Sequence, residues 1–434
     1  INTFFILLNC PVFGGAYTPS AGEDLIFQGS TRTSPYNDYT AGTSFKSISF
    51  SSGASNFTLS GNSIELSGGA SAITTNTTSG TMTIQNNITF NTATPTITNN
   101  TGTTLVLSGT IANGGLRITV TGSGNTQFTN VISGSEGITI NTALDNVTLL
   151  SANNTFGGNV QITMGGIRIQ HSNGLGLGPK TIIMSNGTAG QPSLRLNGSS
   201  GDISLASNIG FNISSSTGTY GGVINEAGNN TIAGAITLNS GGGDSRFHVD
   251  GGTLTITGNV SPIVTNRGLI LSGTGNGTFS GILIDNGFPA ANIKKYGTGT
   301  WTITGANTYT GATLVDAGTL RLGAAGVIPD GSAVTVNGTL DLYGYSETVG
   351  SIAGTGFIDN TSGVGTYTLT TGSNNTSTSF SGIIKNTSGT IAFEKTGTGV
   401  QTISGGNSYS GSTTISAGTL KLGAAGVIPD ATAV

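Results

Sequence analysis

Four residues that could carry out acid–base chemistry fall between positions 244 and 250 of this sequence: Asp244, Arg246, His248 and Asp250. On an extended strand they would share one face, because successive side chains point to opposite faces. Two carboxylates with an arginine and a histidine could move protons to and from a sugar. The segment is therefore the candidate centre of a polysaccharide lyase or hydrolase.

A structural interpretation of the same segment competes with the catalytic one, and we favour it. Phe247 and Val249 would point inward, while the four polar side chains would line a solvated outer face and compensate one another's charges. No further carboxylates that would complete a calcium site are evident nearby. We therefore expect no catalytic residue, no metal site and no cofactor.

A low charge content limits the partners of the chain. Only 7% of residues are charged, the formal net charge is −4, and no basic cluster occurs. Nucleic acid and anionic membrane are therefore not expected partners. No apolar run approaches the ~18 residues of a membrane-spanning helix, so no transmembrane segment is expected. One cysteine provides neither a disulfide framework nor a metal cluster.

Short alternating segments dominate the chain from about residue 46 to residue 434. Leu194–Leu196, Leu254–Ile256 and Leu320–Leu322 each place a polar residue between two apolar ones, and Gly or Asn follows soon after. This pattern is typical of strands with one buried face, and no helical periodicity longer than a turn is present. Many short strands joined by turns admit a sandwich, a propeller or a coil of stacked turns.

An internal repeat favours the stacked coil. Residues 295–334 and 395–434 are identical at 26 of 40 positions without a gap. Repeats of this kind form units that bury their apolar faces only by stacking on neighbours. We predict an all-β, right-handed parallel β-helix (a solenoid) with about 20 residues per turn, and with Thr, Ser and Asn ladders on the outside.

The first part of the chain differs from the rest. Regular alternation is weak over residues 1–45, which hold three of the ten prolines. We predict an atypical N-terminal cap there, since a solenoid needs a closing unit at its end. The apolar run Phe4, Phe5, Ile6, Leu7 and Leu8 is a candidate assembly segment, because a donated strand could pair with an open sheet edge.

The repeated motifs resemble a known family. Lys395-x-Gly397-Thr398-Gly399, Asn407-Ser408-Tyr409-Ser410-Gly411 and Ala417-Gly418-Thr419-Leu420 are similar to the passenger-associated transport repeat of bacterial autotransporter passenger domains. We place repeat units near 131–178, 279–330 and 380–430, the last cut off within the repeat. In these units Phe156, Tyr309 and Tyr409 could grip glycans, but we favour packing within their own turn.

The resemblance implies an extracellular or cell-surface protein, associated with the bacterial outer membrane through a C-terminal part beyond this sequence. We expect a non-catalytic structural or adhesive β-helix protein that could assemble into filaments or a sheath. Its expected partners are other copies of itself or surface glycans and proteins. The alternative is a passenger enzyme, a polysaccharide lyase or hydrolase built on a β-helix.

Overall fold

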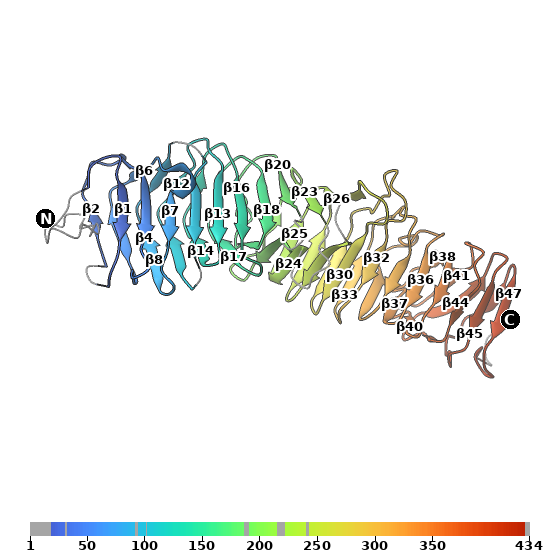
Figure 1. The fold of residues 1–434 in the computed structure, drawn as a ribbon. Helices are drawn as coiled ribbons and strands as arrows, with labels where there is room; N and C mark the ends of the chain where they lie inside the picture. The colour runs from blue at the N-terminus through green and yellow to red at the C-terminus, as the bar shows by residue number, and fades with distance from the viewer. Residues whose placement is uncertain are drawn as a thin grey trace. The chain divides into compact units, whose positions relative to one another are not determined.

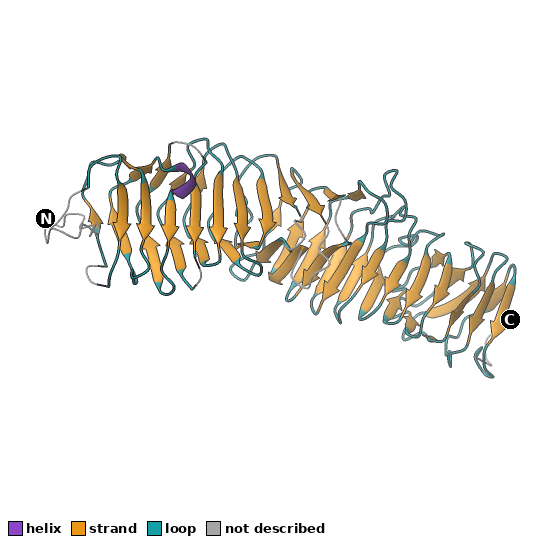
Figure 2. Cartoon of the chain, viewed as in Figure 1, coloured by secondary structure: helices purple, strands orange, loops and turns teal. Residues whose placement is uncertain are grey.

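The computed structural model describes residues 19–30, 33–91, 94–100, 102–185, 191–214, 222–239 and 243–429. The chain divides into two compact units, the first covering most of residues 1–222 and the second most of residues 223–434. Strands joined by loops make up each unit (Figures 1 and 2). The only helix in the described part is a 3-10 turn at Gly69–Ser71.

The strands of the first unit lie in three ladders of neighbours. The first ladder contains β1 (Asp24–Phe27), β4 (Ser47–Phe50), β7 (Ile73–Thr75), β10 (Thr96–Asn99), β13 (Ile118–Gly122), β16 (Ile138–Thr142), β18 (Val160–Met164), β20 (Lys180–Met184) and β23 (Ile209–Ser214). The second contains β2 (Tyr36–Asn37), β5 (Thr58–Gly61), β8 (Thr81–Ile84), β11 (Thr104–Leu107), β14 (Asn125–Phe128), β17 (Val147–Leu150), β19 (Gly166–Ile169) and β21 (Ser193–Asn197). The third contains β3 (Thr43–Phe45), β6 (Ile64–Leu66), β9 (Ile88–Phe90), β12 (Ile111–Ala112) and β15 (Ile132–Ser133). The short strand β22 (Ser204–Leu205) belongs to none of these three ladders.

The second unit is built in the same way. One ladder holds β24 (Gly222–Ala227), β27 (Ser245–Val249), β30 (Leu269–Gly273), β32 (Ile293–Lys295), β34 (Thr313–Val315), β36 (Ala333–Val336) and β39 (Ser351–Ala353). Another holds β25 (Asn229–Ile232), β28 (Thr253–Ile256), β31 (Asn276–Phe279), β33 (Thr300–Ile303), β35 (Thr319–Leu322), β37 (Thr339–Asp341), β40 (Phe357–Asp359) and β43 (Ile383–Ile384). β26 (Ile236–Asn239) pairs with β29 (Val260–Pro262). A four-stranded sheet contains β38 (Glu347–Val349), β41 (Thr366–Thr371), β44 (Thr390–Lys395) and β46 (Thr413–Ile415). A three-stranded sheet contains β42 (Thr378–Phe380), β45 (Val400–Ile403) and β47 (Thr419–Leu422).

The strand pairings are parallel and in register from turn to turn, which is the arrangement of a solenoid. Ile97 pairs with Ile73 in the preceding turn and with Val120 in the following turn. The predicted all-β parallel solenoid is thus confirmed. The turn from Lys294 to Leu314 has the predicted length, but the turn from Ile73 to Ile97 is longer. The longer turns carry additional residues in the loops between strands, where such additions are tolerated.

Inward-facing residues form columns that run from one turn to the next. In the first unit Ile73, Ile97, Val120 and Ile140 occupy equivalent positions, and each is fully buried. Polar residues between them, such as Thr98, face outward on the same strands. Each turn therefore covers the apolar face of the next, and the stacking of neighbouring turns stabilises the fold.

In the second unit, a glycine on one turn packs against a tryptophan on the next. Gly277 pairs with Trp301 across the ladder, and Trp301 is fully buried. A Cβ atom at Gly277 would lie 2.5 Å from the Trp301 ring, so glycine provides the room for the indole. The indole Nε1 donates a hydrogen bond to the Ser272 carbonyl at 3.2 Å, which satisfies its one polar atom.

Regular stacking begins earlier than the sequence pattern indicated. Within the predicted cap over residues 1–45, β1 and β3 already pair in parallel with β4 and β6. The candidate assembly segment Phe4–Leu8 lies outside the described residues. The right-handed coil and the closing role of the cap stay predictions.

Candidate functional site

The segment that held the candidate acid–base residues is strand β27 with its two flanking residues. Phe247 and Val249 are fully buried, while Arg246 and His248 lie on the outer face. The strand pairs with β24 on one side and β30 on the other. The alternation predicted from the sequence for this strand is therefore the observed one.

Asp244 differs from the expectation of a solvated group. Its side chain is only 6% exposed, and it accepts hydrogen bonds from the Gly268 amide at 2.9 Å and from Lys294 Nζ at 2.6 Å. The residue precedes the strand, so its side chain can reach the two following turns. Asp244 is held by Lys294 and does not compensate Arg246, whose Nε is buried without a partner among the described residues.

His248 joins two neighbours on the outer face. Its Nδ1 lies 3.0 Å from Ser272 Oγ, and its Nε2 lies 2.9 Å from Asp250 Oδ1. Serine, histidine and aspartate joined in this order occur in serine hydrolases. However, Ser272 is only 3% exposed, so its hydroxyl is poorly placed to attack a substrate carbonyl. We interpret the three residues as a hydrogen-bonded group that links adjacent turns.

The two carboxylates do not form a pair. Asp244 and Asp250 stand at opposite ends of the strand, and six residues of extended chain span roughly 20 Å. Paired carboxylates of glycosidases lie about 5 to 9.5 Å apart. Asp250 is also largely exposed, whereas Asp244 is buried. The arrangement therefore does not support acid–base catalysis by this pair.

Buried lysines occupy the repeated Lys-x-Gly turn. Lys295 Nζ donates to the carbonyls of Tyr296, Gly297 and Ala317, at 2.9, 2.7 and 3.1 Å. Lys395 makes the three equivalent contacts, and both side chains are almost fully buried. Burial lowers the pKa of Lys295 to about 8. These lysines tie one turn to the next and are closed to outside ligands.

Repeated asparagines join three consecutive turns. Asn307 Oδ1 accepts from the Leu283 amide at 2.8 Å, and its Nδ2 donates to the Val327 carbonyl at 2.8 Å. The members of this set, each bonded to the preceding and the following turn, are Asn154, Asn307 and Asn407. The first lies within the predicted unit near 131–178 and makes the same contacts as the asparagines of the two later units.

The repeated aromatic residues are packed, as we favoured. Phe156, Tyr309 and Tyr409 are each no more than 1% exposed. The hydroxyls of Tyr309 and Tyr409 lie 2.6 and 2.7 Å from Thr313 and Thr413. They are unable to stack on a glycan, so the alternative of an exposed aromatic row at these positions is wrong.

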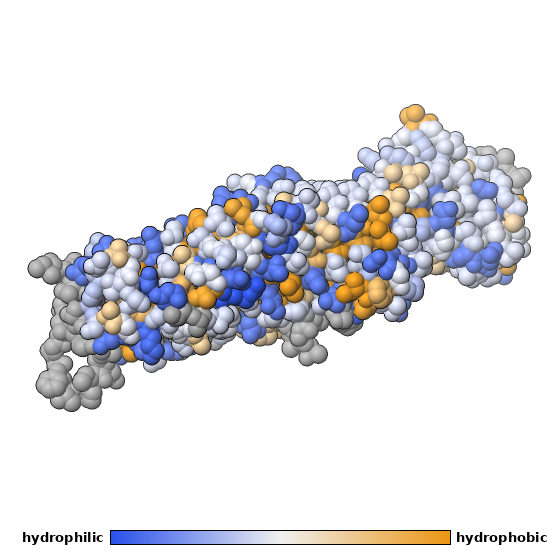
Figure 3. Space-filling view, turned by 90° about the horizontal axis from the view of Figure 1, so that it is seen from above, coloured by the Kyte–Doolittle hydropathy of each residue, from blue (hydrophilic) through white to orange (hydrophobic). Residues whose placement is uncertain are grey.

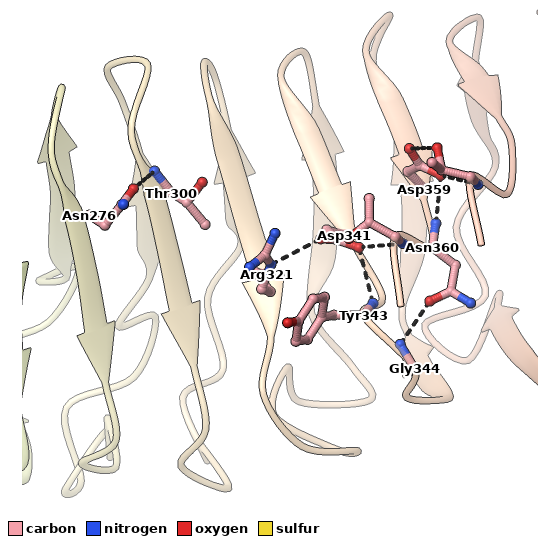
Figure 4. Close-up of polar contacts among 10 residues, drawn as sticks. Asn276, Thr300, Arg321, Asp341, Tyr343, Gly344, Asp359 and Asn360 are labelled. Atoms are coloured by element: carbon pink, nitrogen blue, oxygen red, sulfur yellow. Dashed lines mark hydrogen bonds and ion pairs between the residues drawn. The ribbon is translucent and has the colours of Figure 1, made fainter. Parts of the chain in front are cut away.

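A charged ladder that sequence reasoning missed runs across β35, β37, β40 and the residue after β43. Arg321 pairs with Asp341 at 3.0 Å, as Figure 4 shows. Lys385 pairs with Asp359, also at 3.0 Å. Each carboxylate also accepts hydrogen bonds from the amide and the hydroxyl of a threonine one turn later. Thr361 is the donor to Asp341, and Thr387 is the donor to Asp359. Burial raises the pKa of Asp359, but the hydrogen bonds from Lys385 and Thr387 outweigh it and leave this pKa below its usual value.

Asp341 and Asp359 have no lone pair left for a metal. Asp341 accepts from four donors, which are Arg321 Nε, the Tyr343 amide, and the amide and hydroxyl of Thr361. Asp359 is also reached by four donors, which are the Asn360 amide, the amide and hydroxyl of Thr387, and Lys385 Nζ. In the part of the chain that the structure describes, His, Cys, Asp and Glu do not gather in threes as metal ligands would. The ladder therefore holds turns together.

The repeated segments are similar to known proteins. The sequence profile of the passenger-associated-transport-repeat matches residues 293–322 and 393–422. These are the segments with the buried lysines, bridging asparagines and packed tyrosines. The adhesin BmaC autotransporter of Brucella suis biovar 1 (strain 1330) is 35% identical over 247 residues, which are 56% of this chain and 6% of that protein. The chain resembles an autotransporter passenger domain.

This likeness supports an extracellular or cell-surface location for the passenger. The chain spans only 6% of the length of that relative. No solved structure matches the chain. Across the described residues, helices long and apolar enough to span a bilayer are absent.

Proposed function

We propose that this chain is a non-catalytic, adhesive stretch of a bacterial surface protein. The observation that carries the proposal is the 35% identity to an autotransporter named as an adhesin, over more than half of the chain. The two matched transport repeats point to the same class. Under this proposal each unit would present the outer side of its stacked turns to a partner.

The use of the polar side chains supports this proposal. Lys295, Lys395, Asn307 and Asp341 are buried and bonded to neighbouring turns. The surface holds few charges, and Figure 3 shows a face of mostly pale and blue residues with interspersed apolar groups. Such a surface offers hydrogen-bonding groups with little long-range electrostatic attraction.

Adhesion is tested with fluorescent beads that carry the purified chain. We expect beads coated with the folded chain to adhere to cultured epithelial cells more than beads coated with an equal mass of the heat-unfolded chain or albumin. Equal adhesion of all three bead types across several cell lines and bacterial surfaces would overturn the proposal. Circular dichroism of the coating stock confirms that the native chain is folded.

Self-assembly into filaments or a sheath is a finer part of the proposal. The apolar segment Phe4–Leu8 could add a strand to an open edge of a second copy. Deletion of residues 1–16 is expected to reduce end-to-end association, measured by sedimentation velocity. An unchanged distribution of sedimentation coefficients would count against this segment.

A passenger enzyme is the second candidate, and one observation favours it: the hydrogen-bonded Ser272, His248 and Asp250. If these residues, or Asp244, were catalytic, His248→Ala and Asp244→Asn would abolish release of products from polysaccharide or its ester groups. We expect no turnover by the native chain. Turnover that both substitutions leave intact would point to a centre elsewhere.

A further inference from the structure

One outer face of the second unit carries an array of small polar residues without charge. It is formed by the outer residues of β25, β28, β31 and β33 together with Thr319 of β35 and Thr339 of β37, and we call it the threonine face. One column of the array contains Asn229, Thr253, Asn276, Thr300, Thr319 and Thr339, and a parallel column contains Thr231, Thr255, Thr278 and Thr302. Successive turns place these side chains about 4.8 Å apart, and the two columns lie about 7 Å apart.

Three hydroxyl groups of this face have no hydrogen-bond partner among the described residues. Thr255, Thr278 and Thr302 are half-buried, and among the described residues their hydroxyls make no hydrogen bond to the protein. Hydroxyls on the first unit can behave differently, since Thr98 Oγ1 and Thr121 Oγ1 lie 3.0 Å apart and bond to each other. A hydroxyl both donates and accepts, so each free one can pair with a sugar hydroxyl.

Two exposed aromatic rings continue the same surface. Phe357 follows Thr339 in the first column and is 44% exposed, and Tyr343 lies just beyond Asp341 and is 38% exposed. The Arg321 guanidinium lies 4.1 Å from the Tyr343 ring centroid, and Lys385 Nζ lies 5.6 Å from that of Phe357. These cations help to hold the rings in place.

Charge on this part of the face is compensated within the protein. Arg321 is paired with Asp341 and Lys385 with Asp359. The surface thus combines neutral hydrogen-bonding groups with two exposed rings, on successive strands as Figure 4 shows for Asn276, Thr300, Arg321 and Asp341. Sugars match this combination, because a pyranose presents hydroxyls at its rim and apolar C–H groups on its faces.

We propose that the threonine face, together with Tyr343 and Phe357, binds a neutral linear polysaccharide that lies along the stack of turns. Successive turns would supply threonine hydroxyl groups to the glycan, and the two rings would stack on sugars at one end. The proposal rests on the adhesive function and names its ligand class. An acidic glycan fits less well because the array offers it no unpaired cation, and a protein partner would find no apolar pocket in the array.

The test uses the full chain and soluble polysaccharides. Thr255→Val, Thr278→Val and Thr302→Val together remove three hydroxyls and keep β-branched side chains on the strands. The matched control replaces Thr237, Thr335 and Thr348, which lie on other sheets, with valine. Binding to glucomannan, xylan and the charged polygalacturonate is measured by affinity electrophoresis and calorimetry, in low salt and in high salt.

We expect the native chain and the control to bind at least one neutral polysaccharide with similar affinity in both salt concentrations, since no ion pair is involved. The triple variant on the threonine face should bind at least tenfold more weakly, and Tyr343→Ala with Phe357→Ala should also weaken binding. Binding to polygalacturonate alone, equal loss in the control, or no binding while the coated beads still adhere would overturn this inference. Loss of bead adhesion by the native chain would instead overturn the adhesive function.

Discussion

At the scale of single residues, buried polar side chains join neighbouring turns. Asn307 bonds to Leu283 in the preceding turn and to Val327 in the following turn. Lys295 and Asp341 form comparable links from other positions. Because these groups are buried and bonded, losing one partner leaves the other unsatisfied, which costs more than the net value of the hydrogen bond.

Replacement of Asn307 by alanine tests this role. The variant loses the acceptor for the Leu283 amide and the donor to the Val327 carbonyl, so the second unit should lose about 3 kcal/mol of stability. The single tryptophan, Trp301, lies in this unit and reports its unfolding in urea by fluorescence. The exposed Asn337 provides the control variant Asn337→Ala. Equal midpoints for the two variants would contradict the bridging role.

Glu347 is expected to make the stability of the second unit depend on pH. Its side chain is buried and accepts from the amides of Gly326 and Ile328, both at 2.8 Å. Burial raises the pKa of Glu347 to about 7, from an ordinary value of 4.5, and the backbone hydrogen bonds only partly offset this. The folded chain therefore binds this proton more tightly than the unfolded chain does.

The sign of the effect follows from this difference. The stabilisation is complete below pH 4.5 and is lost as the pH rises to about 7, by roughly 3 kcal/mol in total. We expect the urea midpoint followed at Trp301 to fall between pH 5 and pH 8, and to fall less in Glu347→Gln. Glu394→Gln serves as the control. A pH dependence that Glu347→Gln leaves unchanged would show that other groups cause it.

At the scale of elements, the strands are defined by alternation and by contact between turns. Leu254, Thr255 and Ile256 alternate as the sequence indicates, with the apolar pair buried. The partner of each strand depends on the number of residues in each turn, which varies with the loops. The alternation was therefore predictable from the sequence, whereas the register was predictable only where the repeat is close to exact.

The contact between Gly277 and Trp301 provides a test of this register. Gly277→Ala would place a methyl group against the indole, and overpacking of this kind costs about 1–3 kcal/mol. In a Trp301→Leu background the same substitution should cost less, because the smaller side chain leaves room. Unfolding followed by circular dichroism measures the four members of this cycle. Additive effects would indicate that the two residues do not face each other.

The candidate site shows the same limit of sequence reasoning. Asp244, Arg246, His248 and Asp250 were found from their spacing on one strand, but the partners Lys294 and Ser272 lie on later turns. Only the stacking of turns brings these residues together. Partners on neighbouring turns are separated in sequence by about one or two turn lengths, and this spacing could have revealed Lys294 and Ser272. Loops of variable length obscured it.

At the scale of the whole molecule, the stacked turns of a parallel solenoid leave their outer faces exposed. The repeats supply turn-to-turn links, and we propose that the outward faces contact partners. The interior groups that titrate, such as Lys295 and Glu347, are bonded within the stack. Function should therefore depend on side surfaces such as the threonine face and hardly at all on titratable side chains.

The central claim is that the intact chain binds a surface partner without converting it. The most direct measurement incubates the chain with polysaccharide preparations and with whole cells, then determines bound protein and released sugar or acid in the same sample. The account predicts saturable binding with no product above that from the heat-unfolded chain. Product that accumulates with time and disappears in His248→Ala would contradict it.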